Sequence, residues 1–68
     1  MNITIGKFPG SSIRPLNLPE GKTVADALAA AGIDASGFDI RINGSVGALG
    51  TVLMEGNAVL LTQKIKSN

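Results

Sequence analysis

The 68-residue chain contains no cysteine, histidine, tryptophan or tyrosine, and each absence excludes some chemistry. Without cysteine there is no disulfide, no thiolate nucleophile and no zinc–sulfur site. Without histidine, the chain lacks the commonest general base and the commonest metal ligand. Two phenylalanines are the only aromatic residues, which leaves little for stacking on nucleic-acid bases.

Net charge and long apolar runs are also lacking. The formal charge of +1 argues against binding nucleic acid through bulk positive charge. No apolar run approaches the roughly 20 residues of a membrane span, and the N-terminus does not resemble a signal peptide. A single domain of this size has little room for a buried active site. We therefore expect one cytoplasmic, non-enzymatic domain over residues 1–68, without membrane association, cofactor or metal.

The clearest local pattern is a helix within residues 18–33. Thr23 is suited to the N-cap, and Asp26 stands three residues later, where a capping box places an acid. One helical face is apolar, since the spacing i, i+3, i+4, i+7 is occupied by Val24, Ala27, Leu28 and Ala31. Gly32 suits the left-handed residue that ends a helix. We expect this face to be buried, with Leu28 as its main anchor.

The segments around the helix have the alternation and turn signals of strands. We predict strands over residues 1–7, 13–18, 38–43 and 58–65, with a further short strand near Ala48 or Leu49. Pro15 cannot donate to a ladder, so the second segment should be an edge strand. Residues 66–68 are expected to be a frayed tail. The predicted fold class is α+β, with a mixed four- to five-stranded sheet, the first and last strands at its centre, and one helix packed on one face.

Three stretches in this order resemble the β-grasp ubiquitin-like superfamily. They are Leu-Pro-Glu-Gly-Lys-Thr-Val-Ala-Asp-Ala-Leu at 18–28, Ile-Arg-Ile-Asn-Gly at 40–44, and Leu-Met-Glu-Gly-Asn-Ala-Val-Leu-Leu at 53–61. The chain is most similar to the sulfur-carrier branch, which includes the thiamine-biosynthesis sulfur carrier and the small subunit of molybdopterin synthase. The resemblance implies a β-grasp fold and a protein partner.

One feature of these carriers has no counterpart in the sequence. Carriers of this branch end in Gly-Gly, whose carboxylate is adenylated and then becomes a thiocarboxylate. A bare glycine backbone suits the narrow channel of an activating enzyme. Here the last ten residues contain no glycine. The carrier function therefore cannot be transferred residue by residue.

Three functions follow from the resemblance and this difference. The first is a small non-enzymatic protein-binding module without a reactive tail. The second is a sulfur carrier or protein modifier whose terminal glycines are removed or are encoded beyond this sequence. The third is an RNA-binding domain like the β-grasp appendages of some aminoacyl-tRNA synthetases and GTPases, which the scarcity of aromatic residues and the low net charge disfavour. We prefer the first.

Two groups of residues are candidates for partner binding. Lys7, Lys64 and Lys66 would share one end of the sheet if the first and last strands run parallel, and could then dock an acidic partner or nucleic acid. Solvated lysines at strand ends are the simpler interpretation. Val46, Leu49 and Met54 lie in a poorly patterned region, where they form either core or an exposed docking patch, and we slightly favour core.

An exposed edge hairpin containing Ile13 and Leu16 could pair with another chain to form a homodimer.

Two other patterns have simpler explanations than a functional site. Glycines at positions 44, 47 and 50 recur every three residues, but the lysine and Ser/Thr of a phosphate-binding loop are missing, so we interpret them as turn glycines. Asp34 and Asp39 could form a carboxylate pair only if they converge with a third group. We expect Asp34 to be a turn residue and Asp39 to be an outward strand residue.

Overall fold

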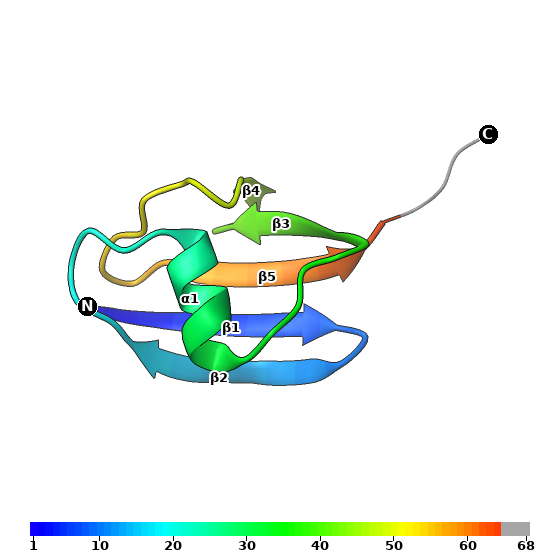
Figure 1. Ribbon diagram of the computed structural model, residues 1–68, viewed down its shortest axis with the longest axis horizontal. Helices are drawn as coiled ribbons and strands as arrows, with labels where there is room; N and C mark the ends of the chain where they lie inside the picture. Colours follow the sequence, from blue (N-terminus) through cyan, green and yellow to red (C-terminus); the bar gives the residue numbers. More distant parts are fainter. Residues whose placement is uncertain (65–68) are drawn as a thin grey trace.

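The structure is a computed structural model that describes residues 1–64. A mixed five-stranded sheet carries one helix across one of its faces (Figure 1). The elements in chain order are β1 (Asn2–Phe8), β2 (Ser11–Asn17), α1 (Val24–Ala31), β3 (Phe38–Ile42), β4 (Ser45–Val46) and β5 (Ala58–Gln63). The predicted α+β architecture is confirmed. The predicted frayed tail, residues 66–68, lies outside the described residues.

The first and last strands pair at the centre of the sheet, as predicted. Strand order is β2-β1-β5-β3-β4. β1 and β5 run parallel, with Ile5 opposite Val59, whereas the other three strand pairs are antiparallel. Because β1 and β5 are parallel, the chain must cross from one edge of this pair to the other, and the segment containing α1 makes that crossover.

Helix α1 begins with the predicted capping box. The Thr23 backbone N–H donates to Oδ2 of Asp26 over 2.9 Å, and the Asp26 N–H donates to Oγ1 of Thr23 over 3.4 Å. Gly32, with φ of 70°, ends the helix in the left-handed conformation. These signals limit the helix to eight residues. Within residues 1–64, no helix is long and apolar enough to cross a membrane.

The carboxyl end of α1 receives its positive charge from another element. Its last turn contains no basic residue, but the Arg14 guanidinium of β2 donates to the carbonyl oxygen of Ala31. Arg14 is opposite Ile5 in the ladder, so both lie on the helix side of the sheet. A cation at this end complements the helix dipole, so Arg14 ties the edge strand to the helix.

The core lies between the helix and the central strands. Its buried residues are Ile3, Ile5, Leu18, Val24, Ala27, Leu28, Leu53, Val59 and Leu61. Alternate residues of β1 and β5 are buried, as expected for strands with one covered face. Leu28 is 5% exposed and belongs to this cluster, which confirms it as a helix anchor.

Pro15 lies on the edge strand β2 at a position whose N–H would point away from β1. The ladder between β1 and β2 therefore loses no hydrogen bond there. The Leu18 N–H donates to the Met1 carbonyl over 2.9 Å. This bond shows that Asn2 and Asn17 form a non-hydrogen-bonded pair. Because the two kinds of pair alternate along an antiparallel ladder, Thr4 and Pro15 also form a non-hydrogen-bonded pair. The N–H that Pro15 lacks would point outward, so an incoming strand would find no donor there. The homodimer through this edge stays a prediction, and Pro15 weakens the case for it.

The predicted short strand near Ala48 or Leu49 is wrong. Asn43 and Gly44 both have positive φ, at 51° and 84°, and form a two-residue turn. The ladder therefore resumes at once, with Ser45 opposite Ile42. β2 likewise extends over Ser11–Asn17 rather than 13–18, because the Pro-Gly turn between β1 and β2 is tighter than expected.

We predict that Leu28→Ala destabilises the fold by about 2–5 kcal/mol, because truncating a buried leucine loses its burial and leaves a cavity. Urea denaturation followed by circular dichroism measures this free energy. The exposed Leu49 provides a control, and Leu49→Ala should cost under about 1 kcal/mol. An equal effect of the two substitutions would remove Leu28 from the core.

We predict that stability falls in acid partly through Asp26. The Thr23 N–H bond holds the pKa of Asp26 below its usual value of 3.8. Ionised Asp26 therefore favours the folded state above about pH 4, and this contribution is lost as the pH falls through the lowered pKa. Denaturation midpoints between pH 7 and pH 2 should drop less in Asp26→Asn than in the wild type. Identical pH profiles would contradict this role.

Candidate functional site

The face of the sheet opposite the helix is open to solvent. Ile3 and Ile5 of β1 and Val59 and Leu61 of β5 are buried on the helix side. Because successive strand residues point to opposite faces, the residues between them lie on the other side of the sheet. The one helix within residues 1–64 does not cover this second face.

A row of side chains crosses all five strands on this open face. Ladder register places Gly6 opposite Leu60, Leu60 opposite Arg41, and Arg41 opposite Val46. Ile13 of β2 packs beside Gly6. We call Ile13, Gly6, Leu60, Arg41 and Val46 the open-face row. Its ends are well exposed, at 58% for Ile13 and 79% for Val46.

Gly6 keeps this row continuous. A Cβ at position 6 would lie 2.7 Å from Cγ1 of Ile13, which is closer than real contacts allow. The Ile13 side chain therefore leans over the bare glycine and occupies the space between β2 and β5. The row becomes an apolar strip interrupted by one guanidinium, that of Arg41.

The preference for Val46, Leu49 and Met54 as core residues is wrong. Their side chains are 79%, 51% and 70% exposed, respectively. After the two residues of β4 the chain leaves the sheet and crosses to the start of α1, where the Ala25 N–H donates to the Leu49 carbonyl over 3.0 Å. Leu53 takes the core position instead.

A docking patch made of these three residues stays a prediction. Each lines a different hollow of the surface, and only Val46 belongs to the open-face row. Sequence reasoning missed most of this row because its members become neighbours only through the ladder registers. The alternation in residues 2–8 and 58–63 could have identified the open face, but not which residues stand side by side on it.

The parallel pairing of β1 and β5 brings Lys7 and Lys64 to the same end of the sheet, as predicted for strands that run parallel. The Lys7 ammonium lies 4.5 Å from the centroid of the Phe38 ring. The Lys64 N–H donates to the carbonyl of Gly37, which precedes Phe38. Lys66 lies outside the described residues. Docking of an acidic partner by these lysines stays a prediction.

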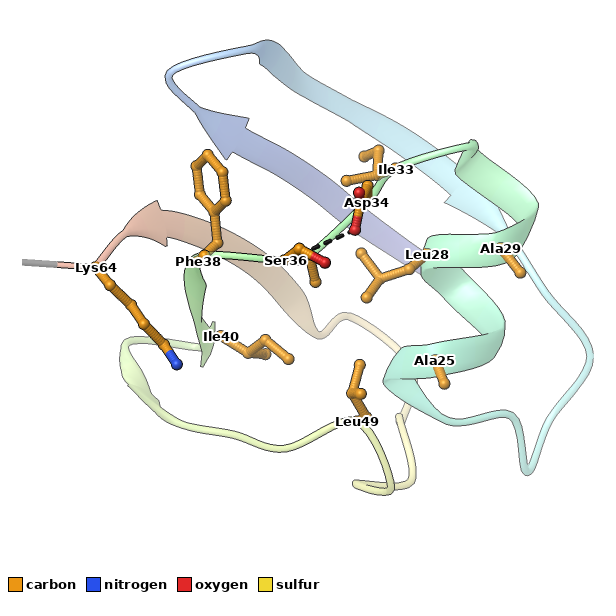
Figure 2. Close-up of a pocket in the computed structure, with 12 residues that line it drawn as sticks. Ala25, Leu28, Ala29, Ile33, Asp34, Ser36, Phe38, Ile40, Leu49 and Lys64 are labelled. Carbon is orange, nitrogen blue, oxygen red and sulfur yellow. Dashed lines mark hydrogen bonds between the residues drawn. The ribbon is translucent and has the colours of Figure 1, made fainter.

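A second concave surface lies on the helix side of the sheet, between α1 and β3. This hollow has a volume of about 590 Å³ (Figure 2). It is lined by Ala25, Leu28, Ala29, Ile33, Asp34, Ala35, Ser36, Gly37, Phe38, Ile40, Leu49 and Lys64. In Figure 2 the side chains of Leu28, Ile40 and Leu49 point into a common space. We call it the α1–β3 groove.

The two aspartates singled out in the sequence do not converge. The Ser36 N–H donates to Oδ1 of Asp34 over 2.9 Å and lowers the pKa of this carboxyl, as expected of a turn aspartate. Asp34 lines the α1–β3 groove, whereas Asp39 lies on the opposite face of the sheet, between Phe38 and Ile40. Residues 1–64 hold no cluster of three or more His, Cys, Asp or Glu side chains that could bind a metal.

Two of the three recurring glycines, Gly44 and Gly47, have structural roles. Gly44 adopts a positive φ in the turn after β3. A Cβ at Gly47 would lie 2.5 Å from Cδ1 of Ile42, so this glycine allows close packing against β3. Neither lies at the start of a helix, which a P-loop would require.

Solved structures of known proteins share this architecture. No family model matches the sequence, and a search of curated proteins gives no match. Among solved structures, the crystal structure of SAMP1 from Haloferax volcanii matches with a TM-score of 0.78 and 19% identity over 100% of both chains. Another crystal structure, of H. volcanii small archaeal modifier protein 1, matches with a TM-score of 0.77 and 20% identity, over 94% of this chain and 98% of that one.

A ubiquitin-like protein from Caldiarchaeum subterraneum matches with a TM-score of 0.57 and 17% identity, over 98% of this chain and 100% of that one. At these identities the comparisons bear on the fold. The chain has the ubiquitin-like β-grasp fold, which confirms the predicted fold class. Its assignment to the sulfur-carrier branch stays a prediction.

We predict that Gly6→Ala destabilises the fold by about 1–3 kcal/mol, because the added methyl group must displace Ile13. In an Ile13→Ala background the destabilisation caused by Gly6→Ala should be smaller, since Cγ1 of Ile13, the closest clashing atom, is absent. Gly50→Ala is the matched control, because nothing lies within 4 Å of its added Cβ. Thermal denaturation of all the variants measures the coupling. A cost that is unchanged in the Ile13→Ala background would contradict the packing of Ile13 over Gly6.

Proposed function

We propose that this chain is a small protein-binding module that docks on protein partners through the open-face row. The observation that carries the proposal is the run of Ile13, Leu60 and Val46 across one sheet face, with Arg41 between the last two. Contiguous exposed apolar surface on a small domain is typical of an interaction site. Arginine is enriched at such interfaces.

The chemistry of the row indicates what it would accept. Leu60 and Arg41 are half-buried in the sheet and therefore held in place before a partner arrives, which lowers the entropy cost of docking. The guanidinium can take a carboxylate in a bidentate pair. A partner surface with an apolar side chain beside an Asp or Glu fits this strip best.

A catalytic role has less support than a binding role. The chain has neither cysteine nor histidine, and its two best-placed carboxylates, Asp34 and Asp39, lie on opposite faces of the sheet. General acid–base work requires such groups to meet at one reacting atom. The proposal therefore assigns no reaction to the chain itself.

The second candidate is a protein modifier or sulfur carrier. It is favoured by the likeness to the two Haloferax volcanii structures, one of which is named a small archaeal modifier protein. In this function ATP would adenylate the C-terminal carboxylate with release of pyrophosphate, and the acyl group would then pass to an amine or to a sulfur donor with release of AMP. A terminal glycine suits this step because it carries no side chain. Docking on an activating enzyme would still need a protein-binding face, so both candidates share the use of the open-face row.

We predict that charge reversal of Arg41 removes partner binding. Arg41→Glu should reduce recovery of specific partners from a lysate of the source organism by roughly 30-fold, the effect of losing about 2 kcal/mol at a binding hot spot. Quantitative mass spectrometry of affinity-purified chain measures recovery. Lys22→Glu is the charge-matched control, because Lys22 is exposed in the loop before α1. Equal recovery by the two variants would contradict the proposal.

The same affinity-purified chain distinguishes a binding module from a modifier or sulfur carrier. A modifier would appear as isopeptide-linked adducts of the chain that survive denaturation, and a carrier as a C-terminal thiocarboxylate. A binding module would be released from all partners by denaturant.

A further inference from the structure

A second row of side chains lies on the open face, beside the open-face row. Ladder register places Phe8 opposite Thr62, and Thr62 opposite Asp39. Each of the three stands two residues along its strand from a member of the open-face row, and therefore points to the same face. We call Phe8, Thr62 and Asp39 the Phe8 row. Phe8 is 45% exposed, and Asp39 is also exposed.

Strand β3 gives the open face one acid and one base, in Asp39 and Arg41. Both border the same hollow of about 280 Å³, together with Val46. Among residues 1–64, the charged side chains that form hydrogen bonds are those of Arg14, Asp26, Asp34 and Glu55. Asp39 and Arg41 are therefore available to a second molecule that presents a base and an acid in the reverse order.

The chain itself presents this reverse order when it is turned over. A two-fold axis that lies between two facing sheets, at right angles to their strands, places each strand over its own copy in the opposite direction. With the axis level with Ile40, the Phe8 row of one copy lies over the open-face row of the other. Asp39 then faces Arg41 of the second copy, and by symmetry the same contact forms twice.

The other residues of the two rows also match. Phe8 would lie over Gly6 and Ile13 of the second copy, which places an aromatic ring against the apolar end of the open-face row. Thr62 would lie over Leu60. Facing sheets pack about 10 Å apart, with strand directions within about 30° of each other. An extended arginine and an aspartate can bridge such a gap through a bidentate pair.

The size of the open face sets the expected strength of this association. Its four longer strands, spaced about 4.8 Å apart with a rise of about 3.3 Å per residue, give a projected area of roughly 400 Å² per copy. The total for two copies, roughly 800 Å², is below the ~1,200 Å² at which stable complexes begin. We therefore expect a weak dimer with a Kd on the order of 0.1–1 mM.

We propose that two copies of this chain associate face to face, through the open-face row and the Phe8 row, around a two-fold axis that pairs Asp39 of each copy with Arg41 of the other. The β2 edge takes no part in this dimer. The dimer also has a regulatory effect, which rests on the proposed function: because it covers the open-face row, self-association competes with protein partners for the same surface. The monomer is the form that binds partners.

The test is sedimentation equilibrium of the 6.9 kDa chain from about 0.02 to about 2 mM. Interference optics are used because the chain has no tryptophan or tyrosine to absorb ultraviolet light. The wild type should shift from monomer to dimer over this range. Asp39→Arg alone and Arg41→Asp alone should each weaken association by about tenfold or more, because like charges then face each other twice.

Two combinations restore the opposite charges. The double variant, Asp39→Arg with Arg41→Asp, should dimerise as well as the wild type at unchanged net charge. An equimolar mixture of the two single variants should also associate, because both arginines then lie on one copy and both aspartates on the other.

Matched controls separate these contacts from an effect of net charge. Glu20→Lys and Lys22→Glu give the same net charges as the two single variants, but both residues are exposed in the loop before α1. Each control variant, alone or mixed with the other, should dimerise as the wild type does.

A second measurement on the wild type needs no substitution. In a mixture of ¹³C-labelled and unlabelled chain, intermolecular nuclear Overhauser contacts should join the Phe8 ring to the Ile13 methyl groups. Val52, which is 56% exposed and pairs with Thr23 outside the sheet, should show none.

Asp39→Arg also separates the dimer from the proposed function. This variant should lose the dimer and keep the recovery of partners from a lysate, whereas Arg41→Glu should lose both. A monomeric wild type whose partner recovery still depends on Arg41 would overturn the dimer alone.

Several results would overturn the proposed dimer. One is a wild type that stays monomeric at about 2 mM. Another is a folded double variant that stays monomeric, since its restored charge pairs would then play no part. A third is dimerisation of either single variant at wild-type strength. Intermolecular contacts confined to the β2 edge would also contradict it, because they would assign the dimer to strand pairing.

Discussion

The parallel pairing of β1 with β5 is the constraint on which the rest of the structure depends. It joins the two ends of the described chain at the centre of the sheet, with Ile5 opposite Val59 on the covered face. The helix buries Leu28 against that face, and Arg14 ties its carboxyl end to the edge strand. The same register aligns Gly6 with Leu60 on the uncovered face. A slip by one residue would exchange the two faces and destroy both the core and the open-face row.

The open face and the two edges of the sheet differ as binding surfaces. The open-face row presents side chains, so its recognition would depend on apolar contact and on the Arg41 guanidinium. At the β3 edge, β4 covers Arg41 and Ile42, and the Gly47 N–H donates to the Ile40 carbonyl. The β2 edge is also a poor site for an added strand, since Pro15 offers no outward N–H.

Local signals in the sequence predicted the elements whose ends are marked by capping or turn residues. Thr23, Asp26 and Gly32 delimited the helix, and Pro15 identified an edge strand, because each acts on its own neighbours in the chain. The region after Gly44 was predicted poorly. Whether Leu49 or Leu53 is buried depends on how the chain returns to the start of α1, and the hydrogen bond from Ala25 to Leu49 that sets this path joins residues 24 positions apart. No short pattern encodes such a contact.

The candidate sites were less predictable than the fold, for a related reason. Lys7 and Lys64 could be placed at one end of the sheet once β1 and β5 were taken as parallel, because that inference needs only strand direction. The open-face row needs the register of four ladders and the absence of a side chain at Gly6. These are properties of the assembled sheet.

The most direct test of this account is the measurement of nuclear Overhauser contacts from the Leu60 methyl groups. The register described above predicts contacts with Gly6 on one side and Arg41 on the other, and none with the helix. Contacts from Leu60 to Leu28 or Ala27 would place Leu60 on the covered face. The register would then be wrong, and the open-face row would not exist.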